Sequence, residues 1–363
     1  MNVIFKKLSY LLLIMLCLEL ASSCNSDDDD EMTDDDASDD DTADDDTSDD
    51  DLVSDDDSDY VLFGTSSELY TSGDDAFYRW RVYQFDDLSH SWMMIGFRDE
   101  RKDALRVVWA SAPNDVFVVG GGGVIWHYDG VTWQQMASST EGELLAVWGS
   151  GKNDVYAAGR LRPLNQEHPG HVVLHFDGND WSTVQKGQDR FLCGLGGSDE
   201  SNVFAVGAGL VLHFNGIQWT SMEVDSSWFL RRVWSLSDTD AFAVGSENDE
   251  VPLIAHFDGL SWSRMSVEWP NDLYALSDVW GTEPTNVYAV GFLLGDTNNA
   301  MVFHYDGESW SLMEKLDLYG YCMWGSSNNN IFVAGQGTAN WDGSDWNYLE
   351  HSPELWDIYG VKL

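Results

Sequence analysis

The chain has 363 residues, in which 18 Lys and Arg residues stand against 63 Asp and Glu residues, for a formal net charge of −45. Hydrophobic residues make up 43% of the chain and 18 residues are Trp, which excludes a wholly disordered polypeptide because these side chains suffice for a core. The acidic excess excludes a nucleic-acid-binding protein, since it would repel a phosphate backbone.

The first 23 residues have the pattern of a signal peptide. Lys6 and Lys7 precede an apolar run over residues 8–18, and the small residues 21–23 lead directly into Cys24. The apolar run is too short for a stable transmembrane helix, and Glu19 interrupts it. Residues 1–23 are therefore predicted to be removed and take no part in the fold.

The segment Leu20-Ala21-Ser22-Ser23-Cys24 resembles the lipobox of bacterial lipoproteins, in which the cysteine is acylated and becomes the N-terminus. The resemblance implies lipid attachment at Cys24 and a membrane as one partner, because several acyl chains give stable anchoring. Asn25 stands where inner-membrane lipoproteins have Asp, which implies the outer membrane, with the protein at the cell surface or on the periplasmic face. Ordinary cleavage that leaves a free Cys24 is the alternative.

Residues 24–59 form an acidic linker. Residues 25–59 hold 20 Asp and one Glu, without any Lys or Arg. Blocks of like charge repel one another and stay extended, which predicts a disordered, solvated segment. No Gly-containing loop or fixed ligand spacing marks a metal site in it, and calcium binding is left open.

The remaining residues, 60–363, contain an internal repeat. Its marker is His-aromatic-Asp-Gly-x-x-Trp, with Asn for Asp in one copy, and two degenerate copies flank five complete ones. The repeated tryptophans are spaced by 36 to 48 residues, and they are Trp92, Trp133, Trp181, Trp219, Trp262, Trp310 and Trp346. An upstream phrase such as Val147-Trp148-Gly149, followed by residues 154–159, completes each unit. Short runs rich in Val and aromatic residues predict strands, and Asp-Gly between them predicts hairpins.

Four-stranded units of about 40 residues, repeated seven times, predict an all-β fold, a seven-bladed β-propeller over residues 60–363. Residues 355–360 repeat the first-strand pattern at the end of the chain. A terminal strand that completes the first blade would close the ring and remove exposed sheet edges. Residues 60–64 resemble a first strand as well, so eight blades, or an added terminal strand, is the alternative.

The combined phrase Val-Trp-Gly-Ser, Asn-Asp-Val-Tyr-Ala-Val-Gly and His-Phe-Asp-Gly-x-x-Trp resembles an uncharacterised group of repeat-bearing bacterial lipoproteins. This resemblance implies a surface-anchored propeller and no particular activity. The motif is also distantly similar to the Asp-box of sialidase-like propellers, Ser-x-Asp-x-Gly-x-x-Trp. The Gly and Trp keep their spacing, but the Asp adjoins the Gly and no Ser precedes it.

The repeated residues have predicted structural roles. Histidines at one repeat position are spread around a ring, so they cannot converge on a metal ion. The His and Asp of each His-x-Asp point to the same side of a strand, which predicts a hydrogen bond between them. The repeated tryptophans are predicted to pack between blades. Cys193 and Cys322 lie three units apart, which predicts free thiols.

No motif for catalysis, a cofactor or a metal is present, so a binding function without catalysis is favoured. Variable loops are predicted on one propeller face, with a polysaccharide or protein as partner and a monomer as the expected state. The candidate ligand-binding residues are Arg160, Arg162, His168, His171, Trp228 and Trp269. One alternative is a glycan-active hydrolase or lyase, for which Asp278 and Asp357 lie on first strands without any feature that pairs them. Another alternative is a scaffold for outer-membrane assembly.

Overall fold

The structure is a computed structural model of the chain, and it describes residues 60–72, 75–86, 89–101, 104–161, 169–248, 250–271, 273–293 and 299–363. The predicted signal peptide, Cys24 and the acidic linker lie outside the described residues. Nearly all of the described secondary structure is β-strand, apart from one turn of 3-10 helix at Gly121–Gly123. The described residues contain no helix with the length and hydrophobicity needed to cross a bilayer.

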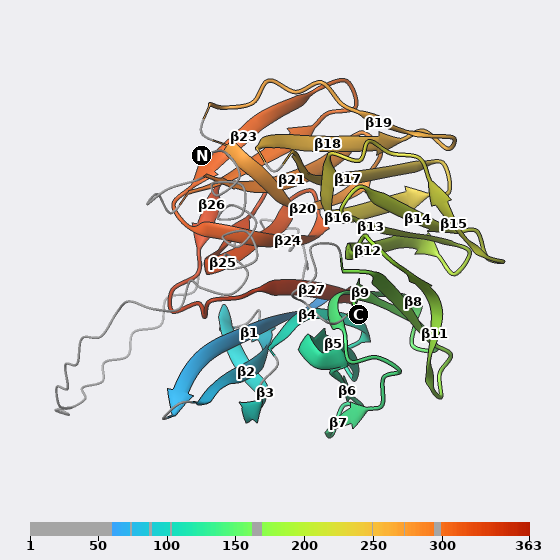
Figure 1. Ribbon diagram of the computed structural model, residues 1–363. Helices are drawn as coiled ribbons and strands as arrows, with labels where there is room; N and C mark the ends of the chain where they lie inside the picture. Colours follow the sequence, from blue (N-terminus) through green and yellow to red (C-terminus); the bar gives the residue numbers. More distant parts are fainter. Residues whose placement is uncertain are drawn as a thin grey trace, which may run out of the picture. The chain divides into compact units, whose positions relative to one another are not determined.

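The strands form seven antiparallel sheets arranged around a common centre, which confirms the seven-bladed propeller (Figure 1). From the innermost strand outward, blades 1 to 3 are β27 (Asp357–Lys362), β1 (Tyr60–Ser72), β2 (Asp75–Asp86), β3 (Ser91–Arg101); β4 (Leu105–Ala112), β5 (Asp115–Gly120), β6 (Ile125–Tyr128), β7 (Trp133–Met136); and β8 (Glu143–Gly151), β9 (Asp154–Arg160), β10 (His171–Phe176), β11 (Trp181–Gly187). Blades 4 to 7 are β12 (Leu192–Asp199), β13 (Asn202–Gly207), β14 (Leu210–Phe214), β15 (Trp219–Met222); β16 (Trp228–Ser237), β17 (Asp240–Glu247), β18 (Val251–Phe257), β19 (Trp262–Arg264); β20 (Leu273–Glu283), β21 (Asn286–Leu293), β22 (Ala300–Tyr305), β23 (Trp310–Leu316); and β24 (Tyr319–Ser327), β25 (Asn330–Trp341), β26 (Trp346–Tyr348).

The last strand of the chain closes the ring. β27 pairs with β1 from Tyr60 opposite Lys362 to Thr65 opposite Asp357, and β27 also contacts the inner strands β4 and β24 of the neighbouring blades. The predicted closure by residues 355–360 is therefore correct. The resemblance of residues 60–64 to a first strand was misleading, because β1 is the second strand of blade 1 and β27 supplies the first.

Blade 7 has three strands, but one of them, β25, folds back on itself and forms two of the four strand segments of the blade. The side chain of Asn340 donates to Asn330 Oδ1 at 2.7 Å and to the Ile331 carbonyl at 3.4 Å, so the two ends of β25 lie side by side. The chain turns back near Gly337, whose φ of 111° lies in a region that favours glycine. β25 thus supplies both the second and the third segment of this blade.

A tryptophan on one inner strand packs against a glycine on the next. A Cβ atom added to Gly149 would lie 2.8 Å from the ring of Trp109, and one added to Gly360 would lie 2.3 Å from the ring of Trp324. The same contact joins Trp148 to Gly197, Trp234 to Gly281 and Trp280 to Gly325. The repeated Trp-Gly pair thus has a physical reason: the glycine leaves the space that the preceding blade's indole fills.

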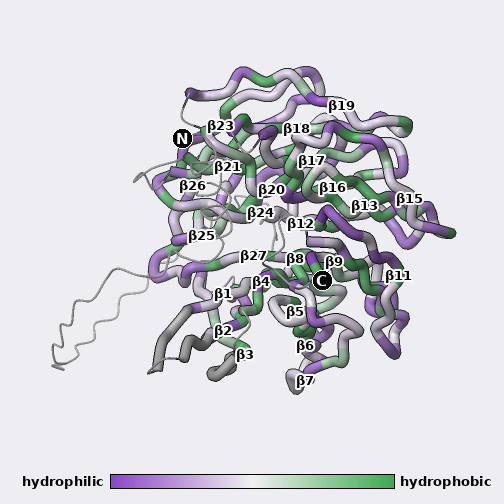
Figure 2. Tube along the Cα trace, viewed as in Figure 1, coloured by the Kyte–Doolittle hydropathy of each residue, from purple (hydrophilic) through white to green (hydrophobic). Residues whose placement is uncertain are grey.

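The outer tryptophans also reach the preceding blade, as predicted from the repeat. The indole Nε1 of Trp133 donates to the Ile95 carbonyl at 3.2 Å. Trp181 and Trp310 reach methionine sulfur atoms of the preceding blade at 3.4 and 3.2 Å. Figure 2 shows hydrophobic residues concentrated along the strands, and hydrophilic residues in many of the connections between them.

The predicted hydrogen bond within His-x-Asp is wrong. His127 Nε2 lies 2.6 Å from Asp115 Oδ1, at the start of the second strand, and the same arrangement joins His175 to Asp154 and His256 to Asp240. Asp129 of the motif instead accepts the backbone N–H groups of residues 131 and 132 at 2.9 and 2.7 Å. The His fastens the second strand to the third, while the Asp stabilises the turn into the fourth.

The connections divide between two faces of the propeller. The turns between first and second strands and between third and fourth strands are short, and we call their side the short-turn face. The connections between second and third strands and between blades lie on the opposite side, the variable-loop face. The numbers of residues in these connections differ between blades.

We expect Gly360→Ala to lower the free energy of unfolding by about 1–3 kcal/mol, because its methyl group would overlap the Trp324 ring at the closing contact. Thermal unfolding of the purified full-length chain measures the change. Gly151→Ala is the matched control, since a Cβ there meets no atom within 4 Å. Equal melting temperatures for the two variants would contradict this account of ring closure.

Candidate functional site

One repeat position brings a single residue from every blade to the centre of the ring. It is the second residue after the Leu of the inner-strand phrase, whose place Gly320 takes in blade 7, and in blades 2 to 7 a β-bulge separates the two positions. Blades 2, 3 and 4 place small or aliphatic residues there, whereas the other four place polar ones. In blade order from blade 2 the residues are Val107, Ala146, Gly194, Arg232, Asp278, Cys322 and Asp357.

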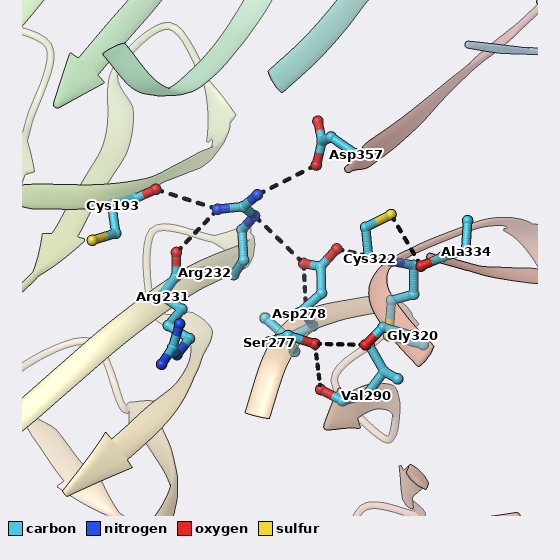
Figure 3. A network of polar contacts seen from close by, with 12 residues as sticks. Cys193, Arg231, Arg232, Ser277, Asp278, Val290, Gly320, Cys322, Ala334 and Asp357 are labelled. Carbon is cyan, nitrogen blue, oxygen red and sulfur yellow. Dashed lines mark hydrogen bonds and ion pairs between the residues drawn. The ribbon is translucent and has the colours of Figure 1, made fainter. Parts of the chain in front are cut away.

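Arg232 is the hub of a polar network at this position (Figure 3). Its Nη2 donates to Asp357 Oδ1 at 3.3 Å, and its Nε lies 4.0 Å from Asp278 Oδ1. Its Nη1 donates to the carbonyls of Cys193 and Arg231, both at 3.3 Å. One guanidinium therefore joins blades 1, 4, 5 and 6.

The two carboxylates extend the network to the next blades. Asp278 Oδ2 accepts the Met323 N–H at 2.9 Å, and Asp357 Oδ2 accepts the Val108 N–H at 3.0 Å. Both aspartates are buried. Their oxygens satisfy backbone groups on inner strand edges that would otherwise lack partners.

Burial changes the acidity of this network. Burial raises the pKa of Asp278 from 3.8 to about 6, against the opposing effect of the Arg232 charge. Burial likewise raises the pKa of Asp357 to about 7, with Arg232 opposing the shift and the negative charge of Asp278 adding to it. Two carboxyl groups share one guanidinium, so the arginine neutralises at most one negative charge.

An aromatic collar lies on the variable-loop face at the end of the inner strands, and we call the region it borders the axial mouth. Its rings are half-exposed, and its members are Phe229, Tyr274, Phe292, Tyr319, Tyr321 and Trp356. Tyr321 and Trp356 stack with centroids 5.5 Å apart and planes 8° apart, and Tyr319 stacks on Tyr321 at 6.4 Å. Such rings offer flat apolar surfaces that sugars or apolar side chains can cover.

Arg231 places a positive charge within the collar. Its guanidinium carbon lies 5.0 Å from the centre of the Phe229 ring and 5.9 Å from that of Phe292. Figure 3 shows its side chain pointing away from the Arg232 network. Its buried Nε has no hydrogen-bond partner among the described residues.

Most of the residues predicted from sequence to bind a ligand are not exposed. Trp228 is 7% exposed and packs in the core of blades 4 and 5. Trp269 is half-buried, with its ring 5.3 Å from that of Phe303. Arg160 is buried in an ion pair with Glu143 at 2.5 Å.

His171 is also buried, and its Nδ1 donates to the Arg190 carbonyl at 3.0 Å. Burial lowers the pKa of His171, which favours the neutral ring. Arg162 and His168 lie outside the described residues. The structure thus brings Arg160 and His171 onto adjacent strands, but it does not gather the six candidates into one exposed surface.

Sequence reasoning missed Arg231, Arg232 and the collar. The signal for them is a departure from the repeat. In the inner-strand phrase Leu-x-x-Val-Trp, the two variable positions hold Arg231-Arg232 in blade 5, Tyr321-Cys322 in blade 7 and Trp356-Asp357 in blade 1. No group of three metal-ligating side chains occurs in the described part of the chain, and neither Cys193 nor Cys322 forms a disulfide there.

No protein-family model matches the sequence, and no curated protein matches it. Solved structures do match. A protein from Lactobacillus plantarum superposes with a TM-score of 0.60 at 13% identity, over 84% of this chain and 99% of that one. A Bacteroides fragilis protein provisionally described as a 6-phosphogluconolactonase gives 0.58 at 10% identity, over 84% and 98%.

YCF48 bound to D1 peptide also matches, with a TM-score of 0.53 at 15% identity, over 74% of this chain and 86% of that one. At such identities the likeness shows the β-propeller fold and leaves the activity open.

We expect the stability difference between the wild type and Asp357→Asn to depend on pH. Because the folded-state pKa of Asp357 is raised from 3.8 to about 7, the folded state holds this proton more tightly. The stability contributed by Asp357 is therefore full below pH 3.8 and falls until about pH 7. The melting temperature of the variant minus that of the wild type should rise with pH across this range and then level off.

The exposed Asp238 provides the control, since Asp238→Asn removes one carboxylate far from the centre of the ring. Its melting temperature relative to wild type should not follow the same curve. If Asp357→Asn differs from wild type by the same amount at every pH, the account of the buried carboxyl is wrong.

Proposed function

We propose that this protein is a non-catalytic binding module, anchored to the outer membrane by lipid on Cys24, which recognises a polysaccharide or a protein at its variable-loop face. The collar carries this proposal. It gathers half-exposed aromatic rings from blades 1, 5, 6 and 7, which lie on or next to the inner strands or, for Phe292, at the end of the second strand β21. Aromatic anchors on a fixed scaffold lose little conformational entropy on binding.

The point where the chain enters the propeller is compatible with binding at the axial mouth. Tyr60 opens β1 opposite Lys362, the end of β27 on the short-turn face. The inner strands begin at the variable-loop face and run toward the short-turn face, so Tyr60 and the collar are on opposite sides of the ring. The predicted linker therefore joins the propeller on the side opposite the axial mouth and leaves the mouth clear of the point of attachment.

A binding role without catalysis is favoured over glycan hydrolysis. Asp278 and Asp357 are the two carboxylates that were considered from sequence as a catalytic pair. Both accept backbone hydrogen bonds from neighbouring blades. They also share Arg232. These contacts give both aspartates a structural role, because they hold the inner strands of adjacent blades together.

We expect the double variant Tyr321→Ala, Trp356→Ala to bind the protein's ligand at least tenfold more weakly than wild type, because the stacked pair at the mouth is lost. A glycan array and a protein array probed with the purified full-length chain give the measurement. Trp356→Phe keeps a ring in place and should retain more of the binding.

The matched control is Ile217→Ala, Leu260→Ala, which removes two side chains that are each 87% exposed on turns of the short-turn face. Thermal unfolding checks that all variants fold. Equal binding by the collar variant, the control and the wild type would rule out the mouth as the binding surface.

We expect Cys24→Ser to release the protein from the membrane fraction, because the proposed acyl chains have no other site of attachment. Fractionation of cells and metabolic labelling with a radioactive fatty acid measure the change. The same substitution at Cys193, which is half-exposed on β12, is the control and should leave the protein labelled and membrane-bound. A labelled Cys24→Ser protein would contradict the anchor.

A further inference from the structure

We infer that the ligand of the axial mouth is an acidic polysaccharide, a chain of uronic acid residues, held by arginine side chains beside the aromatic collar. This inference rests on the proposed binding function and names the class of ligand. The arginines, the shape of the surface next to the collar and the overall charge each contribute to it.

Three arginines on the variable-loop side of the propeller lack a carboxylate partner. Arg106, Arg190 and Arg231 form no ion pair with any carboxylate of the described residues. Other described arginines have acidic partners: Arg81 pairs with Glu68, Arg160 with Glu143, Arg232 with Asp357 and Arg264 with Glu247. Arginines without an acidic partner are therefore concentrated at one end of the ring.

Arg231 and Arg190 lie on neighbouring parts of this surface. Phe191, next to Arg190, has its ring 5.8 Å from that of Phe229, over which Arg231 stacks. Arg231 is fixed by two aromatic rings, so its guanidinium loses little freedom when it binds a carboxylate.

A surface hollow is lined by Arg190, whose neighbour Phe191 contacts the collar residue Phe229. Its volume is about 420 Å³, and Arg190, Gly209, Met222 and Glu223 are among its lining residues. Gly209 has a φ of 58°, and a Cβ there would lie 2.8 Å from Arg190 Nη1. The absent side chain lets the guanidinium lie over the backbone of this turn, where a pyranose ring can reach it.

The negative net charge of the propeller limits where an anionic ligand can bind. Residues 60–363 contain 16 Lys and Arg against 41 Asp and Glu. An anionic polymer is repelled by most of such a surface and attracted where cations lack acidic partners. Within the described part of the chain, the axial mouth is a place where such a cation, Arg231, lies beside half-exposed aromatic rings.

The surface suits a sugar better than an acidic peptide. Glu223 lines the hollow, and Glu354 lies beside Tyr321 with one buried oxygen that has no partner among the described residues. Carboxyl oxygens accept hydrogen bonds from hydroxyl groups, which uronates have and a polyglutamate side chain lacks. The inner strand edges, where a peptide could add as a strand, are capped by Asp278, Asp357 and Arg232.

The test measures binding of the full-length chain to polygalacturonate, to fully methyl-esterified polygalacturonate and to poly-L-glutamate. We expect the wild type to bind polygalacturonate, with an affinity that falls as salt rises, and to bind the ester at least tenfold more weakly. Arg190→Gln and Arg231→Gln should each weaken binding to polygalacturonate by roughly tenfold, as expected for hydrogen bonds to a charged group. Lys152→Gln and Lys362→Gln remove exposed cations on the short-turn face and should have no such effect.

The outcomes separate the two proposals. Equal binding of the ester and the acid, with loss only in the collar variant, would overturn the acidic class and leave the binding function standing. Arginine-dependent binding of poly-L-glutamate equal to that of polygalacturonate would overturn the polysaccharide. Failure of every probe to bind would overturn the inference, and the arrays described above would then decide the binding function independently.

Discussion

The architecture depends on a steric fit between adjacent blades. The indole of an inner-strand tryptophan occupies the place where the next blade has a glycine, and this contact recurs along the ring. Trp324, on the inner strand of blade 7, is the last tryptophan in this series of contacts, and the glycine that it packs against must come from one more inner strand. Gly360 on β27 provides it, and β27 in turn pairs with β1. The ring is therefore closed by the same tryptophan–glycine contact that joins other blades.

The same geometry explains where the unusual residues accumulate. Equivalent positions of a repeat meet at the centre of a ring, so any blade that departs from the common residue changes a shared space. Blades 5, 6 and 1 place Arg232, Asp278 and Asp357 there, and their hydrogen bonds reach the inner strands of three further blades, 2, 4 and 7. One position earlier, blades 5, 7 and 1 carry Arg231, Tyr321 and Trp356, which belong to the axial mouth.

Features that repeat were predictable from sequence, and features that occur once were not. Seven blades and four strand segments in each followed from the spacing of tryptophans and Asp-Gly turns, and closure by the C-terminus followed from the first-strand pattern repeated at residues 355–360. The role of His127 was misjudged because its partner, Asp115, lies across a strand pair and is not its neighbour in sequence. Trp228 was taken for an exposed residue because its sequence position lies outside the repeat, yet it is 7% exposed. Burial in a propeller depends on the adjoining blade, which one unit of the sequence cannot reveal.

The position of β1 has a mechanical consequence. Under the proposed anchoring at Cys24, β1 is the strand through which the drag on a bound ligand would reach the propeller. β1 has a hydrogen-bonded partner on each side, β27 and β2, and the registers overlap at residues 63–65. A force applied at Tyr60 along the strand loads both ladders in shear, so many hydrogen bonds must break together before the strand slides out. A propeller that began with an edge strand would instead peel open one bond at a time.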